Sequence, residues 1–354
     1  MKAVVFKEEG KSNLLDVEVP KINKNQILLK VNSCGICGSD IKFEEGTSVK
    51  IDKGGNKRSM DYPMIIGHEF VGTVVEVGEN VSDYEFGERL NVMPNLPCGQ
   101  CYYCQIGHHE MCDNEKVLGY DYNGAFAEYI VVPERAIRLN GINKLSDKIT
   151  SEEATFVEPV AVSINCQYKS DIRIGDIVLI IGAGPIGCIN MQLAKFNRAK
   201  KVIVAEISDK RLELARKFGA DVLINPLKVD VVEKVKDETK GYGVDKIILC
   251  CGSHEMQERS VYMVNKLGII NYFASLPHLK PEITINANLV HYKEIVITGT
   301  HNSTPLQNKL AYELIERGVI NVKDLITDRF VLDDYYEAIK TAKSGKGMKV
   351  VINF

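Results

Sequence analysis

Four of the ten cysteines lie close together in the sequence, in the order Cys98, Cys101, Cys104 and Cys112. Two overlapping Cys-x-x-Cys steps let thiolates from one short loop converge on a single ion. Four thiolates complete a tetrahedron and leave no position open for a substrate, so the spacing predicts a structural zinc ion. The alternative, a set of free thiols in an exposed loop, is disfavoured by this spacing. We interpret His108 and His109 as solvated loop residues and not as ligands.

A second group of possible metal ligands lies nearer the N-terminus. One segment reads Cys34-Gly-Ile-Cys37-Gly-Ser39-Asp40 and another reads Gly67-His68-Glu69. Thiolate, imidazole and carboxylate groups all bind zinc in proteins. Taken alone, however, the two cysteines are also compatible with a redox pair, and His68 with a histidine satisfied inside a core.

A glycine-rich stretch follows an apolar segment in the middle of the chain. Residues 178–181 are Val-Leu-Ile-Ile, and they run into Gly182-Ala-Gly184-Pro185-Ile186-Gly187, followed at once by a helical run over residues 188–196. In a strand–turn–helix context, this G-x-G-x-x-G pattern predicts a dinucleotide site. Gly182 permits the tight turn, Gly184 lets the backbone approach a pyrophosphate, and Gly187 lets the helix pack on the strand. The alternative is a glycine-rich turn without a ligand.

An acidic residue, Glu206, ends the next apolar segment after this pattern. A carboxylate at that place can accept both ribose hydroxyls of NAD and repels the 2′-phosphate of NADP. The sequence therefore predicts NAD as the cofactor, and we include Arg211 among the cofactor-binding residues.

Short apolar segments alternate with helix-period segments through the second half of the chain. The expected strands are Ile177–Ile181, Lys201–Ala205, Asp221–Ile224, Lys246–Cys250 and Gly268–Phe273. This alternation predicts an α/β fold with a parallel sheet covered by helices on both faces. Residues 1 to about 155 are instead β-rich, with alternating segments such as Ile27–Val31 and Val71–Val77, and the chain ends in an expected strand, Lys349–Phe354.

The length of 354 residues suits two domains. A net charge of -3 indicates neither a nucleic-acid-binding nor an anionic-membrane-binding surface. The first ten residues alternate like a strand and do not resemble a signal peptide. We therefore expect a soluble, cytoplasmic protein that acts on a small molecule. The stretch Gly46–Met60, rich in Lys, Gly and Ser, is predicted to be a mobile loop or lid.

Taken together, these motifs resemble the zinc-containing medium-chain dehydrogenases. The family signature G-H-E-x-x-G-x5-G-x-x-V is matched from Gly67 to Val81, and Gly124–Tyr129 and Ser344–Lys349 also follow the family order. The resemblance covers essentially the whole chain. It implies a β-rich, GroES-like catalytic domain (residues 1–159 and 299–354), a Rossmann NAD-binding domain (160–298) with a doubly wound parallel sheet, an active site in the cleft between them, and a homodimer or homotetramer.

The resemblance also implies roles for single residues. Cys37, not Cys34, and His68 match ligands of a catalytic zinc ion. The third ligand is a cysteine in simple alcohol dehydrogenases, and its place is taken here by Glu158, which is similar to the polyol and sorbitol branch. In that branch the residue matching Glu69 can bind zinc instead, so both carboxylates remain candidates.

Further roles follow from the same resemblance. Asp40 matches the carboxylate that orients the ligand histidine, Ser39 the hydroxyl that takes the substrate proton, and Lys349 the base that neutralises the cofactor pyrophosphate. The family proton relay often ends in a histidine where this chain has Lys42, so the proton leaves through water or through Lys42.

The implied reaction is oxidation of a secondary alcohol to a ketone, with two zinc ions per subunit and NAD. Glu158 and the polar run Thr300, His301, Asn302 and Ser303 favour a polyol or sugar derivative, although an arginine typical of the polyol branch is missing after Gly299. The basic residues Lys50, Lys53, Lys57 and Arg58 suggest a lid that meets a phosphate. The alternatives are a threonine or simple-alcohol dehydrogenase and, more remotely, a non-catalytic protein that binds NAD or zinc structurally.

Overall fold

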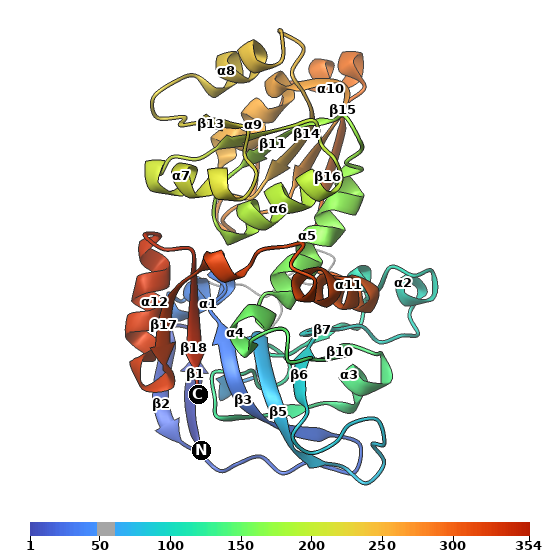
Figure 1. Cartoon of the computed structure of the whole chain (residues 1–354), viewed down its shortest axis with the longest axis vertical. Coiled ribbons are helices and arrows are strands. Elements are labelled where there is room, and N and C mark those ends of the chain that lie inside the picture. Colours follow the sequence, from blue (N-terminus) through green and yellow to red (C-terminus); the bar gives the residue numbers. More distant parts are fainter. Residues whose placement is uncertain (48–60) are drawn as a thin grey trace. The chain divides into compact units, whose positions relative to one another are not determined.

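The structure is a computed structural model that describes residues 1–47 and 61–354. Most of the predicted lid, Gly46–Met60, and its basic residues Lys50, Lys53, Lys57 and Arg58 lie outside the described residues. The chain divides into two compact units (Figure 1). Unit 1 contains Met1–Ala161, Asn302–Gly318 and Val322–Phe354, and unit 2 contains Val162–His301 and Val319–Asn321.

Unit 2 contains a six-stranded sheet in which every neighbouring pair is parallel, in the order β13-β12-β11-β14-β15-β16. Its strands are β11 (Ile177–Ile181), β12 (Lys201–Ala205), β13 (Val222–Ile224), β14 (Val244–Leu249), β15 (Val264–Tyr272) and β16 (Val296–Gly299). The central strands are almost wholly buried because helices cover the sheet. The predicted doubly wound α/β fold is confirmed.

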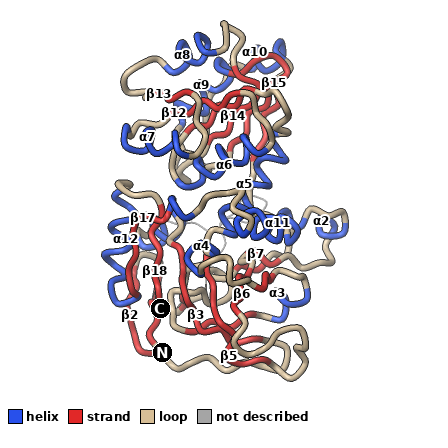
Figure 2. The backbone as a smooth tube through the Cα atoms, in the orientation of Figure 1, coloured by secondary structure: helices blue, strands red, loops and turns tan. Residues whose placement is uncertain are grey.

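The helices of this sheet follow the strands in alternation (Figure 2). They are α6 (Pro185–Phe196), α7 (Asp209–Lys217), α8 (Val231–Glu238), α9 (His254–Met263) and α10 (Ala287–Lys293). Helices α6 and α7 contact β12, whereas α9 and α10 contact β15. A helix that begins in unit 1, α5 (Val157–Ser170), continues into unit 2.

The strands predicted in this half of the chain all form, two of them with the predicted bounds. The sixth strand, β16, was not predicted. It is a short edge strand whose residues are exposed or half-buried, so it lacks the continuous apolar run that marked the others.

Unit 1 is built mainly from antiparallel strands, as the predicted GroES-like catalytic domain requires. Its main sheet has the order β10-β6-β5-β3-β18-β17, with β9 also paired to β3, and a smaller sheet has the order β2-β1-β4. The strands are β1 (Lys2–Glu8), β2 (Lys11–Asp16), β3 (Ile27–Gly35), β4 (Met64–Ile65), β5 (Glu69–Val77), β6 (Arg89–Val92), β7 (Asn95–Leu96), β8 (Lys116–Val117), β9 (Tyr129–Val132), β10 (Ile142–Lys144), β17 (Ile326–Val331) and β18 (Lys349–Asn353).

Short helices connect or cover these strands. They are α1 (Gly38–Glu44), α2 (Tyr102–Gln105), α3 (Glu134–Arg138), α4 (Ser151–Ala154), α11 (Pro305–Glu316) and α12 (Tyr335–Ser344), with 3-10 turns η1 (His109–Met111), η2 (Lys323–Leu325) and η3 (Leu332–Asp334). The core of unit 1 includes the buried aromatic side chains Phe6, Phe43, Phe70, Phe126 and Tyr335. Among the described residues, no helix is both long and apolar enough to cross a membrane.

Candidate active site

Strand pairing in unit 1 brings the two N-terminal motifs together. Strand β3 ends at Gly35, which is paired with Glu69, the first residue of β5. Helix α1 begins directly after β3, with Cys37 as its N-cap residue. The Cys37 backbone N–H donates to Asp40 Oδ2 at 2.8 Å, and this contact closes the first turn. His68 therefore reaches the same end of the sheet as Cys37.

Cys37, His68 and Glu69 can hold a metal ion together. One ligand atom from each lies within 4.8 Å of the others. His68 Nδ1 faces Asp40 Oδ1 at 3.6 Å, and neither atom has another hydrogen-bond partner among the described residues. Because Nδ1 is directed to Asp40, Nε2 remains as the ring nitrogen for a metal. A thiol, an imidazole and a carboxylate are a donor set that fits zinc.

Burial and mutual repulsion change the acidity of these groups. Burial raises the pKa of Asp40 to about 6, against the opposing effect of His68. Burial is also the largest influence on His68 and lowers its pKa, but Asp40, Cys37 and Glu158 together raise that pKa well above its usual value. Burial and the neighbouring Glu69 raise the pKa of Glu158 to about 7. Metal binding would therefore displace protons from this site.

Glu158, the other candidate ligand, lies in the first turn of α5 and is half-buried. Its carboxyl group interacts electrostatically with His68 and Glu69. The triad of close ligand atoms contains Glu69 and not Glu158. The third ligand therefore stays open between Glu69, which belongs to the triad, and Glu158, which lies beside it.

Lys349 forms an ion pair with one of the candidate metal ligands. Its ammonium forms a buried ion pair with the Glu69 carboxylate, and both side chains are at most 6% exposed. Strand β3 lies between the strands that carry these two residues, and Gly35 makes room for the pair. A Cβ at Gly35 would come within 2.7 Å of Glu69 Oε2 and 2.8 Å of Lys349 Cε. Contact of Lys349 with the cofactor pyrophosphate stays a prediction.

The two remaining predicted catalytic residues both lie on α1. Ser39 Oγ is buried and has no hydrogen-bond partner of ordinary geometry among the described residues. Lys42, three positions later, is exposed. The structure adds Tyr120, which the sequence analysis missed, with its ring centroid 6.1 Å from that of His68. No motif marks Tyr120, because only the fold brings it to α1.

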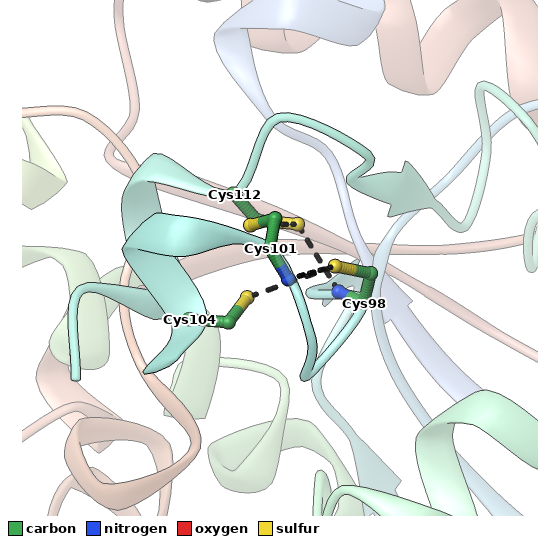
Figure 3. Close-up of side chains that lie close together, drawn as sticks. All are labelled: Cys98, Cys101, Cys104 and Cys112. Atoms are coloured by element: carbon green, nitrogen blue, oxygen red, sulfur yellow. Dashed lines mark hydrogen bonds between the residues drawn. The ribbon is translucent and has the colours of Figure 1, made fainter. Parts of the chain in front are cut away.

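The four-cysteine lobe forms a second, separate group in unit 1. The side chains of Cys98, Cys101, Cys104 and Cys112 point toward one another (Figure 3), and one sulfur from each lies within 4.8 Å of the others. Backbone N–H groups donate to the sulfurs, from Cys98 to Cys112 at 3.1 Å and from Cys101 to Cys98 at 3.2 Å. Such donors stabilise thiolates, and the N–H groups of Gln100 and Cys101 bring the pKa of Cys98 to about 6 despite burial. His108 lies outside the group and contacts Glu110.

Not all of the remaining cysteines are wholly buried. Cys34, Cys166 and Cys188 are buried, whereas Cys250 and Cys251 are half-buried. Burial raises the pKa of the Cys34 thiol well above its usual value. Cys34 is part of the unit 1 core, which separates it from Cys37.

The glycine pattern in unit 2 forms a turn between β11 and α6. Gly182 has a φ of 101°, which favours glycine. Gly184 is the N-cap residue of α6, and Pro185 and Ile186 form its first turn. A Cβ at Gly187 would lie 2.0 Å from the Gly182 carbonyl oxygen, whereas one at Gly184 would find only Arg211 within 4 Å. The space at Gly184 and the free N–H groups expected at a helix N-terminus fit a pyrophosphate.

Glu206 follows β12 directly and is buried beside this turn. Its carboxylate accepts from the backbone N–H of Ala183 at 2.8 Å and of Ser208 at 2.9 Å. Carboxylate oxygens have further lone pairs that can accept ribose hydroxyls. Glu206 therefore fixes the glycine turn, and its contact with the ribose hydroxyls of a cofactor stays a prediction.

Lys349→Met should destabilise the protein by about 3–5 kcal/mol, because it leaves the buried Glu69 carboxylate without its cation. The measurement is the free energy of unfolding in urea. Lys340→Met is the matched control, since the Lys340–Glu337 pair at 3.2 Å is exposed and contributes little. A double variant, Lys349→Met with Glu69→Gln, should recover part of the loss. Equal effects of Lys349→Met and Lys340→Met would contradict the prediction.

Comparison with known proteins agrees with this geometry. Residues 23–140 match the alcohol dehydrogenase GroES-like domain, and residues 185–317 match the zinc-binding dehydrogenase family. An L-threonine 3-dehydrogenase of Pyrococcus abyssi is 36% identical over 96% of this chain and 94% of its own. A D-arabitol-phosphate dehydrogenase of Enterococcus avium is 32% identical over 96% of this chain and 92% of its own.

A solved structure shows the same similarity over the whole chain. It is a zinc-binding dehydrogenase from Sinorhizobium meliloti with bound NADP, with a TM-score of 0.90, 29% identity, and coverage of 100% of this chain and 99% of that one. The buried Cys–His–Glu group, the four-cysteine lobe and the glycine turn are thus found in a chain that matches one family along its length, and the protein belongs to the zinc-binding medium-chain alcohol dehydrogenases.

Proposed function

We propose that the protein oxidises a secondary alcohol to a ketone with NAD, at a zinc ion held by Cys37, His68 and one of Glu69 or Glu158. The observation that carries the proposal is the approach of Cys37, His68 and Glu69 to within 4.8 Å, with Asp40 behind the imidazole. When bound, zinc supplies a Lewis acid that lowers the pKa of the alcohol. A second zinc ion in the four-cysteine lobe is structural, because four thiolates leave no open position.

The residues around this site would orient the substrate and move its proton. Asp40 holds Nδ1 of His68 and so fixes the ring for metal binding. Ser39, two residues after Cys37, would accept the proton of the substrate hydroxyl. Its Oγ is free of ordinary hydrogen bonds among the described residues and so has lone pairs available. Lys42 is exposed on the same helix and would pass the proton to solvent.

NAD is the proposed cofactor because of the buried Glu206 carboxylate. Bringing the 2′-phosphate of NADP against it would cost repulsion and the desolvation of two charges. Arg211 lies near Gly184 and is proposed to contact the dinucleotide as well. The similar structure from Sinorhizobium meliloti holds NADP, so the choice between the two dinucleotides needs its own test.

L-Threonine is the first proposed substrate, and a polyol is the second. The threonine 3-dehydrogenase of Pyrococcus abyssi is more similar than the arabitol-phosphate enzyme. With Glu69 as the third zinc ligand, the half-buried Glu158 carboxylate would attract the ammonium group of an amino alcohol and repel a phosphate.

One argument for a polyol, the polar run after Gly299, is weakened by the structure. The Thr300 hydroxyl donates to Asn271 at 3.0 Å, Asn302 donates to Glu115 at 2.6 Å, and Ser303 is buried. These groups are already occupied or enclosed within their own units. The polyol candidate therefore depends on Glu158 and on the similarity to the arabitol-phosphate dehydrogenase.

Freshly purified protein should contain two zinc ions per chain, with separable roles. Cys37→Ala should retain one zinc ion and NAD binding but lose turnover. Cys112→Ser should instead lower the folded yield, since it removes a ligand from a site that contributes folding energy. Metal analysis and a dye-based unfolding assay provide the measurements. At most one zinc ion in the unmodified protein would count against the assignment.

Catalytic efficiency with NAD should exceed that with NADP by tenfold or more. Glu206→Ala should narrow this ratio and also lower stability, because two backbone N–H groups lose their acceptor. Asp209→Asn is the matched control, since its side chain is 64% exposed and paired with Lys228. A preference of the unmodified protein for NADP would show that Glu206 has been misinterpreted.

Efficiency should be highest for L-threonine in a panel with ethanol, 2-butanol, sorbitol, inositols and hexitol phosphates. We expect the catalytic efficiency with L-threonine to be at least tenfold higher than with 2-butanol, which is about 1.4 kcal/mol in transition-state binding. The reason is that the ammonium group beside the threonine hydroxyl would interact with the acidic groups of the site. Reduction of the cofactor, followed by absorbance, is the measurement. A polyol at the top of the panel would select the second candidate, and equal rates for 2-butanol would contradict both.

A further inference from the structure

A buried asparagine, Asn225, lies beside the loop that carries Glu206. It follows β13 directly and is 9% exposed. Strand β13 pairs in parallel with β12, and the Glu206 N–H extends this pairing by donating to the Ile224 carbonyl at 3.0 Å. The residues after β13 and those after β12 therefore lie side by side at the carboxyl end of the sheet. Open parallel sheets bind their ligands at this end.

The side chain of Asn225 joins these two segments by hydrogen bonds. Its Nδ2 donates to the Ile207 carbonyl at 3.0 Å and to Asp209 Oδ1 at 2.8 Å. Its Oδ1 accepts from the Leu227 N–H at 3.0 Å, within its own segment. The two acceptors match the two hydrogens of the amide nitrogen. Asn225 therefore holds the loop after β12 (residues 206–208) and the first residue of α7.

The loop held in this way also fixes the Glu206 carboxylate. Ser208, which lies between the two contacts of Asn225, donates its N–H to Glu206 Oε1 at 2.9 Å. The other carboxylate oxygen, Oε2, accepts from the Ala183 N–H of the glycine turn at 2.8 Å. One backbone donor for each oxygen sets the orientation of the carboxylate. Of these two donors, the Ser208 N–H belongs to the loop that Asn225 holds.

We propose that Asn225 is a positioning residue that holds the loop after β12, and through it the Glu206 carboxylate, in the orientation that favours NAD over NADP. The proposal rests on the proposed function, because Glu206 is there the group that repels the 2′-phosphate. A carboxylate that can rotate away repels this phosphate less. It also binds the ribose hydroxyls of NAD more weakly, because a group that is already oriented loses less entropy on binding.

Asn225→Ala removes both contacts to the loop. We expect the dissociation constant of NAD to rise about tenfold, the scale of one lost hydrogen bond, and that of NADP to rise less than about threefold. The preference for NAD therefore falls at least about threefold. Isothermal titration calorimetry on the zinc-loaded protein measures both constants without turnover.

Asn197→Ala is the matched control for this variant. Asn197 is also an asparagine of unit 2, and its amide donates to Gln167 at 3.2 Å. It follows the C-terminal end of α6, whereas the glycine turn precedes the N-terminal end. Asn197→Ala should leave both dissociation constants within about twofold of their original values.

Asn225→Ser separates positioning of the loop from folding. A serine hydroxyl can still accept from the Leu227 N–H, as in the turns that serine and asparagine share, but it is too short to hold both Ile207 and Asp209. We expect the same loss of NAD preference as in Asn225→Ala, with a smaller loss of stability in urea. An equal weakening of NAD and NADP in both variants would show a purely structural role and overturn the proposal, as would an unchanged affinity for NAD.

A crystal structure of Asn225→Ser tests the positioning role directly. The Ser208 nitrogen should lie more than about 3.5 Å from Glu206 Oε1, beyond hydrogen-bond distance, against 2.9 Å in the unmodified protein. An unchanged distance would refute the role of Asn225. A preference of the unmodified protein for NADP would instead refute the proposed cofactor, and the Ser208–Glu206 distance would still decide whether Asn225 positions the carboxylate.

Discussion

The concentration of buried charge around His68 is the constraint on which unit 1 depends. The buried carboxyl groups of Asp40 and Glu69 and the half-buried one of Glu158 lie around His68, and Lys349 forms an ion pair with Glu69. Burying carboxylates costs several kcal/mol each unless cations compensate for them. Burial raises the pKa values of Asp40 and Glu158, in agreement with this cost. A divalent cation would compensate for the charge of these carboxylates, so the cluster of acidic groups favours metal binding.

The sheet of unit 1 is what makes this arrangement possible. Strand β3 is flanked by β5 and β18, and the site forms where β3 ends and where its two neighbours begin. Glu69 and Lys349 therefore approach each other across Gly35, whose lack of a side chain leaves room for the ion pair. Helix α1 then begins within three residues and presents Cys37, Ser39 and Asp40 in its first turn. Most of the candidate site residues thus lie at the end of β3, at the adjoining starts of its neighbouring strands, and in the first turn of α1.

The sequence alone predicted those parts of the protein in which neighbouring residues act together. The glycine turn, the cysteine lobe and the Gly67–Glu69 motif are local patterns, and the strands of unit 2 have apolar runs that reveal them. Contacts between distant segments were not predictable in this way. Lys349 and Glu69 are 280 positions apart, and nothing in the local sequence around either residue indicated their ion pair. Tyr120 has no pattern around it, and β16 lacks an apolar run because it is an edge strand.

The two candidate metal-binding groups of unit 1 differ in how fully their polar atoms are hydrogen-bonded. In the cysteine lobe, backbone N–H groups donate to the sulfur atoms of Cys98 and Cys112 and favour negative charge there. Around His68, Asp40 and Ser39 each retain a buried oxygen without an ordinary partner among the described residues. Such unsatisfied groups reduce stability, and proteins usually retain them where chemistry requires open hydrogen-bonding capacity. The lobe therefore satisfies its sulfur atoms with backbone donors, whereas the group around His68 keeps buried oxygen atoms with unused hydrogen-bonding capacity at a cost in stability.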